Sequence, residues 1–313
     1  MKNKRMIFAI GLLLVFFSIT SCKSPQSKPG EISYKSEPTI SLFINQTGEK
    51  KNMKLEEYLA GVVAAEMDTS WHTNALAAQA ILARTFTLEN IASGRVKKLH
   101  GTDASTSVEE FQAYDPSRIN NNVRKAVQMT RGEVVLDSGK FIKSWFSACD
   151  GGVEASAKEG LAYIKTPTPY VNAGAKDNCL SITTPENKSW RAEIPLERMR
   201  EAVKKVSGKD PGTIKSVTIT KRGPSGRAER IRANNVETGG PALRLALGSD
   251  KVRSMFLSSV SIQGWKVIFT GKGFGHGVGM CQWGAQRMAI NGKSPEQIVN
   301  FYFKNVKIQD LWK

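Results

Sequence analysis

The chain has 313 residues, of which 40% are hydrophobic and 23% are charged. This composition is ordinary for a folded protein and excludes disorder over most of the chain, and the length suffices for one large domain or two small ones. The formal net charge at pH 7 is +17.

Residues 1–21 have the layout of a secretory signal peptide. Three cationic residues precede an unbroken apolar run from Met6 to Phe17, which is too short to span a bilayer comfortably. Small residues then stand directly before Cys22, as in the bacterial lipobox, where the thiol is acylated and the chain is cut before the cysteine. We therefore expect a lipoprotein of the cell envelope that begins at Cys22. A plain signal peptide with an incidental cysteine is the alternative.

The partner indicated by the positive charge depends on whether the chain is exported. Without the three cationic residues of the signal region, the charge of +17 becomes +14. In a cytoplasmic protein this would indicate nucleic acid. An exported chain instead meets anionic envelope polymers and lipid headgroups, so we expect no nucleic-acid partner. Generic surface charge is the other interpretation.

The rest of the chain is predicted to be a tether followed by one folded domain. Residues 22–38 are rich in Ser, Pro and Lys and are typical of a flexible tether. Over 39–313, alternation of apolar and polar residues predicts a strand at Thr39–Asn45. Helical spacing of apolar residues predicts helices at Met53–Met67 and at Asn74–Asn90, with Asn74 as the N-cap of the second.

Later elements complete an α+β class. We expect a mixed sheet with packed helices that form a substrate groove, plus a small inserted α/β subdomain over residues 190–264. The elements predicted by apolar periodicity and turn residues are a helix at Val123–Arg131, strands at Val134–Leu136 and Phe141–Phe146, a helix at Leu196–Val206, and a hairpin of Ser216–Lys221 with Arg227–Ala233.

Three cysteines remain after Cys22, namely Cys149, Cys179 and Cys281. An odd number in an exported chain means that one is unpaired or that a metal uses them. No CxxC spacing is present, which excludes a zinc ribbon. We expect a disulfide between Cys149 and Cys179, with a metal site and free thiols as alternatives.

Two segments carry candidate chemistry. Glu66 stands near the end of an otherwise apolar helix, where apolar neighbours would raise its pKa and suit it to donate a proton near neutrality. A solvent-facing glutamate is the alternative. Residues 271–285 place five glycines around His276 and lead to Trp283. This segment could bind a polar polymer, with Trp283 stacking on a sugar ring, or it could be a structural turn with a core histidine.

Five motifs in order resemble the stage II sporulation protein D and LytB amidase-enhancer family. They are EYLAGVVAAEM at 57–67, ALAAQA at 75–80 with ARTF at 83–86, FQAY at 111–114, FSACDGG at 146–152, and GFGHGVGMCQWGA at 273–285. The resemblance covers about Thr39 to Trp312.

The resemblance implies a peptidoglycan lytic transglycosylase that cleaves between N-acetylmuramic acid and N-acetylglucosamine. The family's catalytic glutamate matches Glu66, which would act as the single general acid and base and leave 1,6-anhydro ends. The resemblance also implies substrate contacts, or support for Glu66, at Gln79, Arg84, Gln112, Tyr114, His276, Gln282 and Trp283.

The implied partners are glycan strands, a membrane reached through the lipid anchor, and a cell-wall amidase. No cofactor is expected. Some members bind zinc through cysteine and histidine near the segment that contains Cys149, but the local histidine is absent here. The family often has serine at the position of Cys281.

Two other functions compete with the transglycosylase. One is a noncatalytic wall-binding protein that stimulates an amidase, for which a buried proton donor is unnecessary. The other is a two-carboxylate hydrolase, in which Asp68 or Asp150 would be the partner of Glu66 across a groove.

Overall fold

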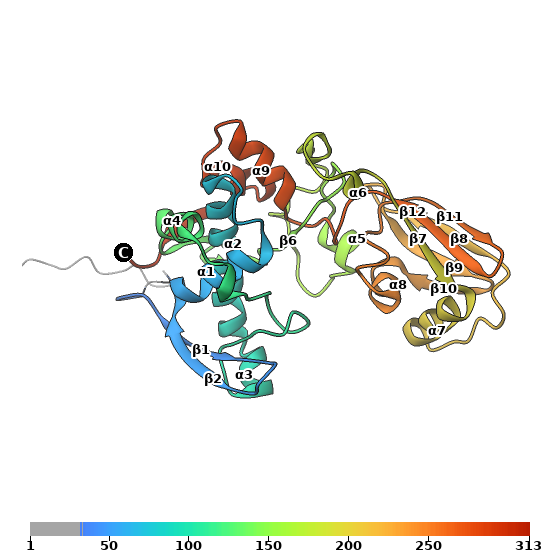
Figure 1. Cartoon of the computed structure of the whole chain (residues 1–313), viewed down its shortest axis with the longest axis horizontal. Helices are drawn as coiled ribbons and strands as arrows, with labels where there is room; N and C mark the ends of the chain where they lie inside the picture. The colour runs from blue at the N-terminus through green and yellow to red at the C-terminus, as the bar shows by residue number, and fades with distance from the viewer. Residues whose placement is uncertain (1–31, 33) are drawn as a thin grey trace, which may run out of the picture. The chain divides into compact units, whose positions relative to one another are not determined.

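The computed structural model describes residues 32 and 34–313 (Figure 1). The predicted signal peptide, Cys22 and most of the tether lie outside the described residues. The described part has the predicted α+β class, and its buried apolar side chains form two separate cores. No helix within this part is long and apolar enough to cross a membrane.

The first core combines segments from both ends of the chain. Its helices are α1 (Leu55–Glu66), α2 (Thr73–Ser93), α3 (Arg95–His100), α4 (Asn121–Met129), α5 (Ala157–Leu161), α9 (Gln282–Ile290) and α10 (Pro295–Tyr302), with 3-10 turns η1 (Pro116–Arg118) and η2 (Cys179–Ser181). Its strands are β1 (Thr39–Phe43), β2 (Lys50–Lys54), β3 (Ala104–Ser105), β4 (Glu133–Asp137), β5 (Lys140–Phe141), β6 (Phe146–Ser147), β13 (Met280–Cys281) and β14 (Lys307–Asp310).

These strands form three small sheets, in the orders β2-β1-β3, β14-β4-β5 and β13-β6. The parallel pair of β6 and β13 matters for the site, because it places Cys281 opposite Ser147. The strand predicted at Phe141–Phe146 is wrong in its middle. There the chain leaves the sheet after β5, and it pairs again only at β6, with a segment from the other end of the chain.

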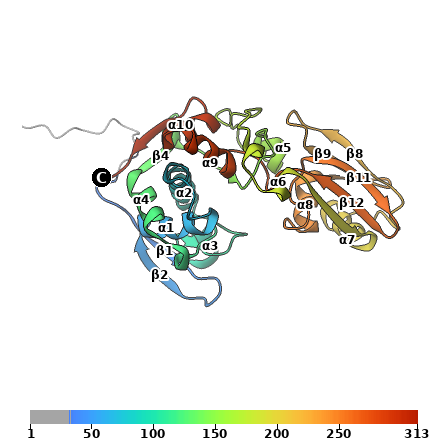
Figure 2. The same ribbon diagram turned by 45° about the horizontal axis from the view of Figure 1, so that its top comes forward.

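Helix α2 is the centre of the first core, and it is surrounded by α1, α4, α9 and α10 (Figure 2). Its many alanines let these neighbours approach closely on several sides. The predicted N-cap is wrong. His72 caps the helix, because its Nδ1 accepts the N–H of Asn74 at 3.1 Å, while the Asn74 amide donates to the carbonyl of Lys293 at 2.8 Å.

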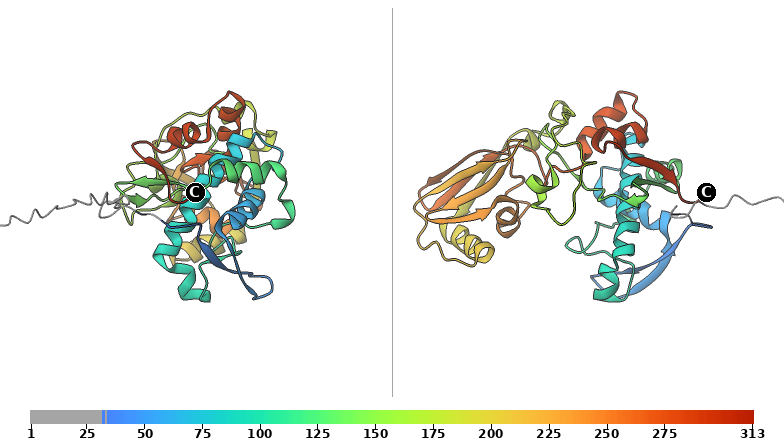
Figure 3. Two further views of the ribbon diagram at one scale, coloured as in Figure 1. Left: turned by 90° about the vertical axis from the view of Figure 1, so that its left-hand side faces the viewer. Right: turned by 180° about the vertical axis from the view of Figure 1, so that it is seen from behind.

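The second core is formed by buried residues between Trp190 and Phe269. After the short α6 (Pro185–Lys188), its strands are β7 (Trp190–Pro195), β8 (Val217–Arg222), β9 (Ala228–Ala233), β10 (Val236–Gly239), β11 (Leu257–Gln263) and β12 (Lys266–Gly271). They form the antiparallel sheets β10-β9-β8 and β11-β12-β7. Helices α7 (Leu196–Ser207) and α8 (Gly240–Leu247) lie together along one side of these strands (Figure 3). The predicted hairpin is confirmed as β8 and β9.

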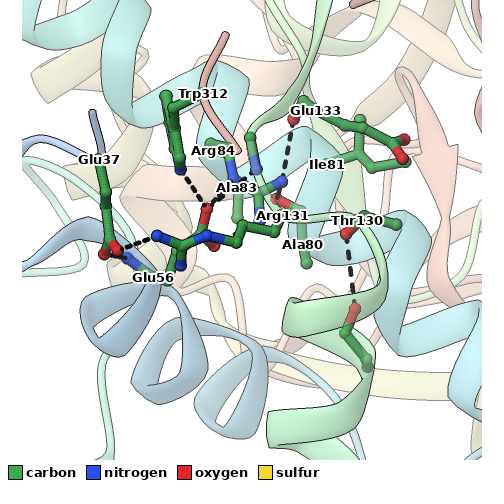
Figure 4. Close-up of polar contacts among 12 residues, drawn as sticks. Glu37, Glu56, Ala80, Ile81, Ala83, Arg84, Thr130, Arg131, Glu133 and Trp312 are labelled. Atoms are coloured by element: carbon green, nitrogen blue, oxygen red, sulfur yellow. Dashed lines mark hydrogen bonds and ion pairs between the residues drawn. The ribbon is translucent and has the colours of Figure 1, made fainter. Parts of the chain in front are cut away.

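A buried ion pair between Arg84 and Glu56 joins α2 to α1 (Figure 4). The guanidinium donates from Nη2 to Oε2 at 2.6 Å and from Nε to Oε1 at 3.1 Å. Oε1 also accepts the N–H of Gly132 and the indole Nε1–H of Trp312, each at 3.1 Å. The remaining guanidinium nitrogen donates to the carbonyl of Glu133 at 2.9 Å. One carboxylate therefore connects two helices, the start of β4 and the C-terminal segment.

We predict that Arg84→Met destabilises the protein by about 3–5 kcal/mol, because it leaves the Glu56 carboxylate buried without its cation. Urea unfolding of the purified protein measures this difference. The double variant Glu56→Leu/Arg84→Met should lose clearly less, since no charge is then stranded. A loss of unfolding free energy below about 1 kcal/mol for the single variant would contradict this, because it would mean that the pair contributes no more than a surface ion pair.

Candidate active site

Glu66 is the last residue of α1, and its half-buried side chain lies beside the segment that precedes η1 in the sequence. Its Oε1 accepts the backbone N–H of Ala113 at 3.1 Å. Burial raises the pKa of Glu66, while hydrogen bonds from Ala113 and from the Gln282 amide oppose that rise. The carboxyl is thus biased toward its neutral form yet oriented by two donors, which suits a group that gives and retrieves a proton.

Gln79 and Gln282 continue this hydrogen-bonded chain behind Glu66. Gln282 opens α9, and its Nε2 donates to Oε1 of Gln79 on α2 at 3.4 Å. Both amides are buried. The Nε2 of Gln79 has no hydrogen-bond partner among the residues described. An unpaired buried donor is costly, so the Gln79 amide is held in place by its contact with Gln282 at some expense of stability.

Trp283 lies against Trp71, with ring centroids 4.5 Å apart and an angle of 58° between the planes. Both side chains are half-buried. The backbone N–H of Trp283 donates to the carbonyl of Ala148 at 3.2 Å, which fixes the start of α9. Sequence reasoning missed Trp71. The available signal was a tryptophan in the short connection between α1 and α2, five positions after Glu66.

The segment containing Gln112 and Tyr114 supports the Ala113 donor. Gln112 is buried, and its Nε2 donates to Oγ1 of Thr87 on α2 at 3.0 Å, so it faces the interior. The Tyr114 ring stacks on Tyr58 at 5.5 Å. It also covers Gly61 so closely that any Cβ there would overlap the ring. A glycine on α1 is therefore what allows this segment to reach Glu66.

Two residues predicted to contact substrate lie elsewhere. Arg84 is fully buried in the ion pair with Glu56, so its guanidinium acts in the core. His276 lines a cavity of about 100 Å³ with Leu161, Arg244 and others. Burial, followed by the charges of Arg244 and Arg227, lowers the pKa of His276 to about 3. Its Nδ1 accepts the N–H of Val278 at 3.1 Å, so this neutral ring serves the local turn.

The two carboxylates considered as partners of Glu66 differ in setting. Asp68 is exposed, and the backbone and hydroxyl hydrogen bonds of Ser70 lower its pKa. Asp150 is 1% exposed. Burial, and then the neighbouring Asp177, raises the pKa of Asp150 to about 7. Asp150 is thus an internal group rather than one facing substrate.

The three cysteines lie together in the interior. The sulfur atoms of Cys149 and Cys179, the predicted disulfide partners, are 3.5 Å apart and not bonded to each other. The sulfur of Cys281 joins them, and all three ligand atoms lie within 4.8 Å of one another. The expected disulfide involved only Cys149 and Cys179, whereas the thiol of Cys281 lies beside both.

The sequence of the chain is similar to known families and proteins. The sequence model of the stage II sporulation protein family matches residues 44–136, which contain Glu66, Gln79 and Tyr114. A second model, described only as a domain of unknown function, matches residues 178–279. An uncharacterized protein of Brachyspira hyodysenteriae (strain ATCC 49526 / WA1) is 32% identical over 262 residues, covering 82% of this chain and 67% of that protein.

The chain belongs to the stage II sporulation protein D and LytB amidase-enhancer family. Stage II sporulation protein D of Bacillus subtilis (strain 168) is 27% identical over 91% of this chain and 83% of its own length. The amidase enhancer of the same organism is 26% identical over 78% of this chain, but over 39% of its own length. Membership of this family supports a cell-wall function in the cell envelope.

We predict that Gln282→Leu raises the pKa of Glu66 further, because the Gln282 amide donates a hydrogen bond that favours the charged form of the carboxyl. A ¹³C NMR titration of the glutamate carboxyl carbons, assigned with Glu66→Gln, measures it. Gln286→Leu is the control, since this amide on the same helix accepts the N–H of His72 instead. Equal effects of both variants would mean that Gln282 does not contact Glu66 in solution.

Proposed function

We propose that this protein is a peptidoglycan lytic transglycosylase with Glu66 as its single general acid and base. The observation that carries the proposal is the setting of Glu66: a half-buried carboxyl with a raised pKa, oriented by the N–H of Ala113 and the amide of Gln282. A hydrolase would need a second carboxylate on the other side of the scissile bond. Asp150 is internal, and Asp68 is exposed and hydrogen bonded to Ser70.

The mechanism uses one carboxyl twice, first as an acid and then as a base. Glu66 gives its proton to the oxygen that joins C1 of N-acetylmuramic acid to C4 of N-acetylglucosamine, and the C1–O bond breaks with its electron pair on that oxygen. The Glu66 carboxylate then takes the proton of the 6-hydroxyl while O6 bonds to C1. The ring closes as a 1,6-anhydro sugar, Glu66 is neutral again, and no water is consumed.

The surrounding side chains supply positioning in this proposal. Gln79 is buried and accepts a hydrogen bond from the Gln282 amide, so it supports the residue that holds Glu66. The paired rings of Trp71 and Trp283 offer an apolar surface on which a sugar can stack. Gln282 holds the carboxyl in the orientation that faces the scissile bond. These groups come from three different helices and their connections, so the site depends on how α1, α2 and α9 pack.

The second candidate is a noncatalytic amidase enhancer, which binds the wall and stimulates an amidase. The relative named amidase enhancer favours it. Binding alone does not require a carboxyl whose pKa is raised by burial, whereas Glu66 is such a group. An associated cell-wall amidase remains compatible with either function.

We also propose that acylation of Cys22 anchors the protein to a membrane outside the cytoplasm. The support is sequence alone: a cationic start, a short apolar run, and small residues before the cysteine. The strongly basic mature chain would then lie close to anionic polymers of the envelope.

We predict that Glu66→Gln still binds glycan strands but loses cleavage by about a hundredfold or more, because the amide can neither donate the first proton nor accept the second. Release of anhydro products from purified strands measures cleavage, and co-sedimentation with the strands measures binding. With the wild type, the rate should fall as pH rises through the raised pKa of Glu66, since only the protonated carboxyl starts the reaction.

Asp68→Asn is the matched control for this experiment, because it removes a nearby carboxylate that the single-acid mechanism leaves out. Its rate should stay within a few fold of wild type. Near wild-type cleavage by Glu66→Gln would exclude Glu66 as the general acid. Binding without cleavage by the wild type would favour the wall-binding function, and equal loss in both variants would favour a two-carboxylate hydrolase.

For the anchor, we predict that cells expressing the protein incorporate radiolabelled palmitate into it, and that Cys22→Ser abolishes the label because the acylated thiol is gone. Cys281→Ser serves as the control, since that buried thiol should be irrelevant to labelling. Equal labelling of wild type and Cys22→Ser would rule out the lipobox.

A further inference from the structure

Three thiols from distant parts of the sequence converge inside the protein. Cys149 follows β6, Cys179 opens η2, and Cys281 ends β13, which pairs with β6. Their exposed fractions are 1%, 0% and 0%. Isolated buried cysteines behave as small apolar residues, but three sulfurs meeting at one point suggest a common ligand.

The spacing of the sulfurs fits a metal better than a disulfide. A disulfide holds its sulfurs about 2.05 Å apart and joins only two of them. Ligands of a tetrahedral zinc ion with Zn–S bonds of about 2.3 Å lie roughly 3.8 Å from one another. Here Cys149 and Cys179 are separated by 3.5 Å, and Cys281 completes a set whose members all lie within 4.8 Å.

Two carboxylates lie beside these sulfurs: ligand atoms of Asp150 and Asp177 lie within 4.8 Å of each other and of the sulfurs of Cys179 and Cys281. Of the two, Asp150 has the free oxygen. Asp150 is 1% exposed, and its Oδ1 accepts the N–H of Gly152 at 2.7 Å and lies 3.2 Å from the sulfur of Cys179. Its Oδ2 has no hydrogen-bond partner in the part of the chain that the structure describes. A buried carboxylate oxygen without a partner is costly, and a bound cation removes that cost.

The neighbouring groups do not neutralise this cluster. Asp177 adds a second buried carboxyl, already occupied by the Cys179 N–H at 2.9 Å and the Tyr302 hydroxyl at 2.7 Å. The buried Arg227 donates to the main-chain carbonyl of Asp150 rather than to its carboxylate. Several acidic groups thus share one interior region, and none of the hydrogen bonds of the Asp150 carboxylate there comes from a cation.

The backbone around Cys281 is already arranged for a thiolate. Its sulfur accepts the N–H of Gly284 at 3.3 Å and that of Asp150 at 3.4 Å. Such N–H···S contacts stabilise negative charge on sulfur and orient a metal ligand. The first of them also caps α9, the helix that begins with Gln282.

We infer that Cys149, Cys179, Cys281 and the Asp150 carboxylate bind one zinc ion in a closed tetrahedral site. Thiolates favour zinc over the hard cations magnesium and calcium. Binding releases the thiol protons to solvent. With four protein ligands the ion has no open position, so its role is structural. It joins β6, η2 and β13 directly behind Gln282. The site does not depend on the transglycosylase reaction, and it replaces the disulfide and the absence of a cofactor expected from sequence.

The test is the metal and thiol content of the full chain, purified in detergent without chelators. We expect one zinc per chain by plasma mass spectrometry, and all of its unacylated thiols reduced when counted with Ellman's reagent after denaturation. Cobalt(II) exchanged into the protein should give the intense visible bands of a tetrahedral site and a thiolate charge-transfer band. These readouts involve no enzyme assay.

Variants assign the ligands. Cys149→Ser, Cys179→Ser and Cys281→Ser should each weaken zinc binding at least tenfold in a competition titration with a chromophoric chelator, and Asp150→Asn should do the same with the three thiolates kept. Asp177→Asn is the matched control and should still hold one zinc. If it loses zinc while Asp150→Asn keeps it, the assignment of the fourth ligand is overturned.

The wild-type protein alone can overturn the whole proposal, whether or not the variants fold. Less than about a tenth of a zinc per chain after purification from zinc-supplemented cells, together with two thiols missing from the count, would show a disulfide. Low zinc with all thiols reduced would show free cysteines. Either result contradicts the site.

Discussion

The position of Glu66 depends on the buried ion pair of Glu56 with Arg84. Glu56 lies at the start of α1 and Glu66 at its end, so a helix fixed at one end carries the carboxyl at the other. The same carboxylate also binds Gly132 and Trp312, which ties the helix to β4 and to the C-terminal segment. A charge taken out of water is stable only with its partners in place, so moving α1 away from α2 would strand the Glu56 carboxylate and the Arg84 guanidinium.

The path of the glycine-rich segment before α9 determines where Cys281 and Gln282 lie. The glycine-rich segment from 273 to 279 runs through narrow spaces, and at Gly277, with φ of 70°, any Cβ would overlap the Arg227 guanidinium. Because the segment can pass this closely, Cys281 lies beside the other two thiols and Gln282 lies within hydrogen-bonding reach of Glu66. The glycines therefore act through backbone geometry, while the polar contact to the Glu66 carboxyl comes from Gln282 in the helix that follows them.

Features that depend on residues close together in the sequence could be predicted, and contacts between residues far apart in the sequence could not. Apolar periodicity located α1, α2, α4 and α7, and the turn residues located the hairpin of β8 and β9. The raised pKa of Glu66 followed from its apolar helix. Periodicity could not show that Arg84 faces Glu56, because 28 positions separate them. Nor could it show that Cys281 joins Cys149, since the pairing of β13 with β6 brings together residues more than 130 positions apart.

The central claim is that one carboxyl performs both proton transfers. Mass analysis of the products from purified glycan strands and wild-type protein tests it most directly. Our account predicts new termini that are 1,6-anhydro-N-acetylmuramic acid, lighter by one water than the hydrolytic product. Reducing N-acetylmuramic acid termini, or intact strands after prolonged incubation with protein that binds them, would contradict it.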